Sequence, residues 1–210
     1  MKHALVTMLE LQDAMNSKVH KDWRNQGNAW YRAIWVECAE LLDHYGWKWW
    51  KAQSPDLEQV ELELIDIWHF GISISLESAS AGDYDDIAEQ LSSALTVDTS
   101  LEKGGEALRV AVERFACTTL QTKSFDANGF AQLMGHSGLS FEQLFRSYVA
   151  KNVLNIFRQD HGYKDGSYRK LWAGREDNEH LMEVLASLTQ AEISRDRIYS
   201  ELLARYQQSA

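Results

Sequence analysis

Apolar side chains recur every three or four residues along most of this chain, which is the spacing of one face of an α-helix. The first such stripe consists of Leu5, Met8, Gln12, Met15 and Val19. The pattern predicts helices over residues 5–19, 30–45, 57–76 and 141–159, two or three more within 83–135, and a helical tail after residue 176. No segment shows the alternation of a convincing strand, so we expect an all-α protein.

The predicted helix over residues 57–76 differs from the others because it is apolar on nearly every side. Such a helix is normally buried in the middle of a bundle. The sequence has one proline, Pro55, so long helices run without a break. We therefore expect a single all-α domain over residues 1–210, a helical bundle with buried central helices. A small helical lobe within residues 83–140 is the alternative.

Composition and charge narrow the classes of partner. The formal net charge is −10, and an acidic surface repels phosphate backbones, so we expect no nucleic-acid partner. A small phosphorylated ligand stays open, because a bound cation reverses the local sign of charge. No apolar run reaches the length that spans a bilayer, and residues 1–6 lack a signal-peptide core, so we expect no membrane partner and a cytoplasmic location. Of the 8 tryptophans, we expect most in the core or in pocket walls.

Two pairs of acidic residues are the first candidates for chemistry. Glu37 and Glu40 are three residues apart, as are Glu63 and Asp66, so each pair shares a helix face. The second pair lies in the all-round apolar helix, where unpaired carboxylates are costly to bury. Four carboxylates with no nearby His or Cys cluster suit a hard cation, with magnesium the natural choice and manganese a substitute. For either pair alone, an ordinary solvated helix face is the commoner explanation.

A polar stripe on the late helix is the second candidate. Lys151, Asn155 and Arg158 are spaced i, i+4, i+7, so they line one face. The loop that follows adds Tyr163 and Lys164 between glycines. Cations together with flexible backbone N–H groups form a phosphate cradle. The alternative is a solvated face followed by an ordinary surface loop.

Gln12 and Phe70 are weaker signals. Gln12 lies on an apolar stripe, where an unpaired amide is costly, and an amide offers a donor and an acceptor to the edge of a pyrimidine base. The alternative is a core-edge glutamine bonded to backbone. Phe70 lies one turn beyond Asp66 and is placed to wall a sugar pocket, although core packing is its commoner role. His69 has no partner at ligand spacing, so we expect a core histidine.

Three blocks of the chain, residues 30–51, 61–70 and 151–178, resemble the dimeric all-α dUTPase family. That family belongs to the wider all-α nucleotide pyrophosphohydrolases, which are related to MazG proteins. The resemblance implies a homodimer that hydrolyses dUTP to dUMP and pyrophosphate, and also dUDP to dUMP and phosphate. It thereby implies a role in keeping uracil out of DNA and in supplying dUMP for thymidylate synthesis.

The resemblance also implies a metal site. The family's E-x-x-E and E-x-x-D motifs, which bind two or three magnesium ions, match Glu37, Glu40, Glu63 and Asp66. Hydrolysis then needs a carboxylate to take a proton from the attacking water. We expect Glu37 in that role, with Glu40 as the second catalytic acid.

The substrate contacts are implied in the same way. In the family's K-N-x-L-N-x-F-R motif the asparagine, here Asn155, recognises the base, and the basic residues, here Lys151 and Arg158, hold phosphates. Gln12 matches an early L-Q motif that contacts uracil, and Phe70 matches a residue that packs on deoxyribose. With the following loop, the expected substrate-binding set is Gln12, Phe70, Lys151, Asn155, Arg158, Tyr163 and Lys164.

Other functions stay open at this point. The nearest alternative is a dCTP/dUTP hydrolase or a broader MazG-like nucleoside triphosphate pyrophosphohydrolase. A second is a non-catalytic helical module that binds a nucleotide or a partner, in which the acids pair with Lys or Arg instead of metal. A DNA-binding helical protein is the third, and the acidic net charge argues against it.

Overall fold

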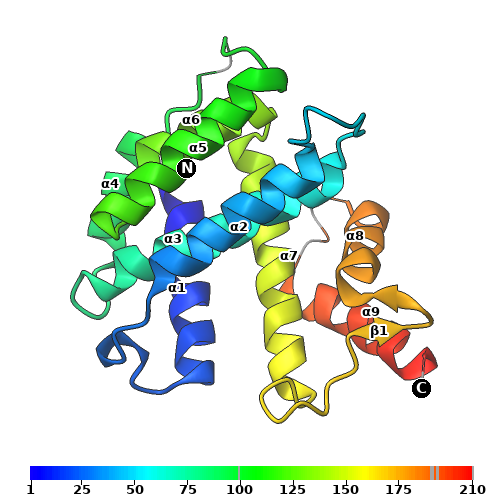
Figure 1. Ribbon diagram of the computed structural model, residues 1–210. Coiled ribbons are helices and arrows are strands. Elements are labelled where there is room, and N and C mark those ends of the chain that lie inside the picture. The colour runs from blue at the N-terminus through cyan, green and yellow to red at the C-terminus, as the bar shows by residue number, and fades with distance from the viewer. Residues whose placement is uncertain (99, 190–191, 193, 210) are drawn as a thin grey trace.

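Helices carry most of the chain in the computed structural model, which describes residues 1–98, 100–189, 192 and 194–209 (Figure 1). The elements are α1 (Lys2–Val19), a 3-10 helix (Trp23–Asn25), α2 (Trp30–Tyr45), α3 (Leu57–Glu77), α4 (Tyr84–Ala94), α5 (Gly105–Thr122), α6 (Ala127–Ser137), α7 (Phe141–Asp160), β1 (Leu171–Trp172), β2 (Arg175–Glu176), α8 (Asp177–Ser187) and α9 (Arg195–Gln208). The predicted all-α class is confirmed. None of the helices in these residues is both long and apolar enough to cross a membrane.

The expectation of no strand is wrong at one place. β1 and β2 pair antiparallel, with Leu171 opposite Glu176 and Trp172 opposite Arg175. The turn between them places Ala173 at φ 49° and Gly174 at φ 82°, both in the left-handed region. Strands of two residues are too short to show the alternation from which a strand is predicted.

α3 lies at the centre of the bundle, as its all-round apolar pattern predicts. It runs antiparallel to α2 and also contacts α1, α6 and α7. Trp68 is fully buried and stacks on Phe130 of α6 at 5.3 Å between ring centroids. Gly71 permits the close approach of Phe125 to α3, because a Cβ there would lie 2.5 Å from the Phe125 ring. The helix that carries Glu63 and Asp66 is therefore held firmly on several sides.

Two hydrophobic cores share α7. The first core includes side chains of α1 to α6, among them Ile87, Phe115 and Phe130, together with Tyr148 from the first half of α7. The helices within residues 83–140 thus contribute to the main core. The second half of α7 contributes to a smaller core with β1, α8 and α9, which includes Trp172. In Figure 1, α7 runs between the larger bundle and these C-terminal elements.

Most of the tryptophans lie in the core or in pocket walls, as expected, although several of them are exposed. Trp23, Trp68 and Trp172 are buried, whereas the exposed ones are Trp35, Trp47, Trp49 and Trp50. Three of these lie in the segment between α2 and α3, where Trp49 is 90% exposed and packs edge-on against Trp50. Trp47 and Trp49 also border an open surface cavity of about 730 Å³ beside Arg109 of α5. None of the predicted site residues lines that cavity.

Candidate active site

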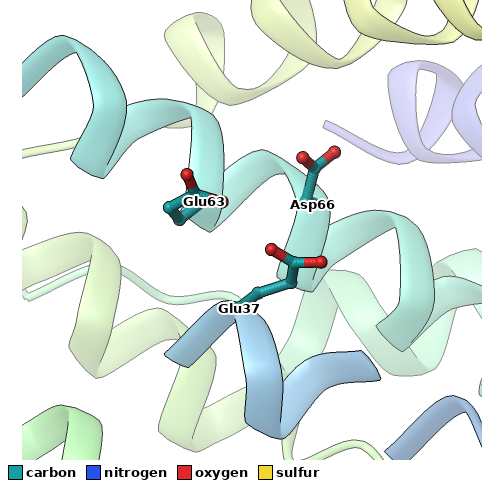
Figure 2. Close-up of side chains that lie close together, drawn as sticks. All are labelled: Glu37, Glu63 and Asp66. Carbon is teal, nitrogen blue, oxygen red and sulfur yellow. The ribbon is translucent and has the colours of Figure 1, made fainter. Parts of the chain in front are cut away.

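Three of the four predicted carboxylates meet between α2 and α3. One carboxylate oxygen from each of Glu37, Glu63 and Asp66 lies within 4.8 Å of the others. The i, i+3 spacing places Glu63 and Asp66 on the face of α3 that looks toward α2. Figure 2 shows the Glu37 side chain rising from α2 toward the pair on α3.

Glu40, the fourth predicted ligand, does not join this cluster. It is exposed on α2, and its carboxylate lies outside the group that Glu37, Glu63 and Asp66 form. It is close enough for its charge to raise the pKa of Glu37. Its role as a metal ligand therefore stays a prediction, one that requires a change in its side-chain position.

The cluster holds more negative charge than its surroundings offset. Burial first, and then the charge of Asp66 and a hydrogen bond with Glu63, raise the pKa of Glu37 well above its ordinary value of 4.5. Burial also raises the pKa of Glu63. Within the described residues, neither Glu37 nor Glu63 has an ion pair with Lys or Arg, and His44 Nε2 lies 3.4 Å from Glu63 Oε1. Lys151 is the one Lys or Arg that pairs with the cluster among the described residues, at Asp66, so three carboxylates face one cation and form an all-oxygen donor set that fits a hard divalent cation.

Lys151 connects the acidic cluster to α7. Its side chain is buried, with 4% of the residue exposed, and its Nζ lies 2.8 Å from Asp66 Oδ2. The same Nζ donates to Asn178 Oδ1 at 3.3 Å. The predicted basic stripe therefore faces the predicted carboxylates directly.

Arg158 lies two helical turns further along α7. Its Nε and Nη2 donate to the two carboxylate oxygens of Asp177, each at 2.8 Å. Nη1 donates to Asn155 Oδ1 at 3.2 Å, and the guanidinium lies over the ring of Tyr163 at 6.0 Å from its centroid. Four of the predicted phosphate and base residues therefore belong to one connected arrangement on and after α7.

Lys164 is the exception within this predicted set. It is exposed, and its Nζ donates to the carbonyl oxygen of Val19 at the end of α1, 3.3 Å away. The structure does not bring it to the carboxylates or to Arg158.

Gln12 belongs to a buried polar network between α1, α3 and α7. Its Oε1 accepts from His69 Nδ1 at 2.7 Å and lies 3.0 Å from the Tyr148 hydroxyl. Its Nε2 donates to Asn16 Oδ1 at 3.0 Å, and within the part of the chain that the structure describes its other amide N–H has no acceptor. Its partners are side chains, not the backbone groups of the alternative explanation.

His69 is a core histidine, as expected, and it has one unusual feature. Burial lowers its pKa to about 4, so the ring is neutral near pH 7. Because Gln12 Oε1 can only accept, Nδ1 carries the hydrogen and Nε2 is an acceptor. That buried Nε2 has no protein partner among the described residues.

Phe70 lies one turn beyond Asp66 on α3 and is half-buried. It packs on Trp30, at the start of α2, at 6.2 Å between ring centroids, and Trp30 packs edge-on against Trp23 at 6.0 Å. An aromatic wall therefore stands at one end of the acidic cluster.

The fold and the site together define a class. Antiparallel helices that bring carboxylates together, opposite cations on a third helix, form an all-α protein equipped to act on a phosphorylated substrate. A family model described as dUTPase matches residues 4–163, and the chain belongs to that dUTPase family. Its activity is the hydrolysis of dUTP, that of a dUTP diphosphatase. No curated protein matches the chain significantly.

Two residues with contacts to this site lie at the end of the block 151–178 that resembles the family, but no role is predicted for them. Asp177 and Asn178 open α8 and contact the cations of α7. They lie 19 and 20 residues beyond Arg158, a separation that no helix period connects, and a loop and a hairpin intervene. The pairing of β1 with β2, together with the packing of α8 on α7, returns the chain to these cations.

Proposed function

We propose that this dUTPase is a magnesium-dependent enzyme in which Glu37, Glu63 and Asp66 hold the metal, with Glu40 as a further ligand. The observation that carries the proposal is the group of three carboxylates within 4.8 Å of one another, short of positive charge. Magnesium supplies charge neutralisation for phosphate oxygens and lowers the pKa of water when bound. Manganese, which prefers the same oxygen donors, substitutes for it.

Glu37 is the proposed proton acceptor. Its side chain extends from α2 into the cluster, so its carboxylate would face a water held there, and a bound cation would favour its ionised form. Glu40, exposed beside it, is the second proposed catalytic acid. Lys151 and Arg158 neutralise the charge that develops on the phosphates, since both already lie on the face of α7 beside the cluster.

The other proposed contacts to the substrate use hydrogen-bond donors that are still available and an aromatic side chain. Gln12 retains one amide N–H for a uracil carbonyl, and Asn155 retains its amide N–H groups because Arg158 uses only its oxygen. Phe70 packs on the sugar. Tyr163 and Lys164 close on the phosphates from the loop after α7.

A nucleotide panel tests the metal requirement and the substrate range together. Equal concentrations of dUTP, dUDP, dCTP and dATP are assayed for pyrophosphate and phosphate, with magnesium, with manganese and with chelator. We expect dUTP and dUDP to be hydrolysed, dCTP and dATP to be poor substrates, and chelator to abolish turnover. Comparable rates on dCTP would favour a dCTP/dUTP hydrolase, and comparable rates on dATP a MazG-like enzyme. Unchanged turnover with chelator would show that hydrolysis does not require a metal.

We further propose a homodimer. Beyond the resemblance, support comes from exposed apolar side chains on α2 and the segment after it, where Trp35, Val36 and Trp50 are all more than 40% exposed. Sedimentation equilibrium should give twice the mass of the chain, and a monomer at micromolar concentration would overturn this. A cytoplasmic location and the absence of a nucleic-acid partner stay predictions.

A further inference from the structure

The two-point contact of Arg158 is made by a residue near the end of the block 151–178, beyond residues 4–163 that the family model matches. Asp177 is fully buried, and both of its carboxylate oxygens accept from the Arg158 guanidinium. The Tyr168 hydroxyl also donates to Asp177 Oδ2, at 2.7 Å. A two-point, charge-assisted pair of this kind fixes the plane of a guanidinium as well as its position.

Asn178 connects the two cations of α7 to each other. Its Oδ1 accepts from Lys151 Nζ and from Arg158 Nη2, each at 3.3 Å. Lys and Arg side chains are long and lose much rotational freedom when they are held in one place. The two residues that open α8 therefore restrict both cations before any substrate arrives, which is the condition for efficient electrostatic stabilisation.

Most of the N–H groups of Arg158 already have protein partners. A guanidinium has five N–H groups. Asp177 takes one from Nε and one from Nη2, Asn178 takes the other from Nη2, and Asn155 takes one from Nη1. Among the described residues one Nη1 hydrogen has no partner, so the partners of Arg158 determine which part of it can meet a phosphate.

The start of α8 is itself held by the second core. The Asp177 backbone N–H donates to the Lys170 carbonyl at 3.0 Å. His180, one turn along α8, has its Nε2 2.9 Å from the carbonyl oxygen of fully buried Trp172. These contacts tie the first turn of α8 to the hairpin of β1 and β2.

We infer that Asp177 and Asn178 are positioning residues of the active site, which hold Arg158 and Lys151 in the arrangement that binds the substrate phosphates. The hairpin and α8 are then part of the catalytic unit of this enzyme. The inference rests on the proposed function, because it requires that Arg158 contacts the substrate.

A double-mutant cycle on kcat/KM for dUTP tests it, with Asp177→Asn, Arg158→Ala and the double variant. We expect each single change to lower kcat/KM about tenfold or more, since each removes or misplaces a charged hydrogen-bonding group. The double variant should be no worse than Arg158→Ala alone, because Asp177 acts through Arg158. A purely structural role of Asp177 would instead give effects that multiply, and that result would overturn the inference.

The matched control is Asp160→Asn. Asp160 ends α7 and is likewise linked to a cation and a tyrosine hydroxyl, those of Lys18 and Tyr199, but it contacts neither Arg158 nor Lys151. Its kcat/KM should stay at the wild-type value. Loss of activity in this variant equal to that of Asp177→Asn would also overturn the inference.

A second variant tests the inference if Asp177→Asn does not fold. If circular dichroism shows that Asp177→Asn is unfolded, Asn178→Ala replaces it in the cycle, because Asn178 is half-buried and uncharged. Its effect should then be smaller in the Arg158→Ala background than in the wild type, but not absent, because Asn178 also holds Lys151. Two failures stay distinguishable. Normal activity of Arg158→Ala would show that Arg158 does not contact the substrate, and it would overturn the inference as well. A large loss for Arg158→Ala, combined with additive effects of Asp177→Asn or Asn178→Ala, would overturn the inference and leave the proposed function intact.

Discussion

Glu37→Gln is expected to lower kcat for dUTP by about 100-fold or more while it raises the thermal stability of the metal-free protein. The loss follows from removal of the proposed general base, a group that typically contributes about 10²–10⁴-fold. The gain follows because burial and the neighbouring carboxylates oppose a charge at this position. An amide removes that charge and keeps the shape, and about 1 kcal/mol of stabilisation shifts the midpoint of a domain of this size by roughly 2–4 °C.

Steady-state kinetics and thermal unfolding in chelator measure the two effects of Glu37→Gln in one preparation. Glu40→Gln is the matched control for stability, because Glu40 is exposed and lies outside the cluster. Its unfolding midpoint should rise by less than that of Glu37→Gln, because Glu40 opposes the Glu37 charge only from outside the cluster. Near-normal kcat in Glu37→Gln would exclude Glu37 as the base. An unchanged midpoint would mean that the burial of its carboxylate beside other acids does not destabilise the metal-free protein.

Lys151→Met is expected to lower the thermal stability of the metal-free protein, whereas Glu37→Gln is expected to raise it. Lys151 is buried and provides the cation that Asp66 contacts at 2.8 Å. Removing one partner of a buried ion pair typically costs about 3–5 kcal/mol, because the other charge is left uncompensated. Methionine keeps most of the apolar stem, so this loss reports the charge and not a cavity. We expect the metal-free variant to unfold at a markedly lower temperature than the wild type.

Magnesium should restore part of that stability. A ligand that binds only the folded state stabilises it by RT ln(1 + [L]/Kd), and the cluster without Lys151 has more charge to offset. Unfolding is therefore followed with and without magnesium, and the metal-induced shift should be larger in Lys151→Met than in the wild type. The matched control is Lys21→Met, at an exposed position, which should change neither value. An equal magnesium shift in all three proteins would contradict a metal site beside Lys151.

The helices and part of the site follow from local patterns. The residues of α2 match the predicted segment, because its apolar stripe ends at Gly46, which adopts φ 92°. The burial of Glu63 follows from the apolar character of α3 on every side. Which α2 carboxylate joins it depends on the rotation of α2 against α3. Sequence spacing treats Glu37 and Glu40 alike, whereas the packed structure brings half-buried Glu37 into the cluster and leaves Glu40 exposed.

Contacts over long separations were beyond the reach of the pattern. His69 meets Gln12 across 57 positions, and Asp177 meets Arg158 across a loop and a hairpin. Neither pair repeats at a helical period, so their residues look like unrelated polar positions. The exposed tryptophans between α2 and α3 have a similar explanation, since hydrophobicity alone does not distinguish a core side chain from one on the surface.

One helix shared by two cores has a consequence for how this enzyme tolerates change. The first half of α7 is packed in the main bundle, whereas its second half, with Arg158, depends on the C-terminal elements. Local opening of those elements would leave the carboxylates between α2 and α3 in place, but it would move the Arg158 guanidinium away from its position. Substitutions around Trp172 thus reduce the fraction of competent molecules at a distance from the metal site. Activity is then a more sensitive gauge of the integrity of the C-terminal core than global unfolding.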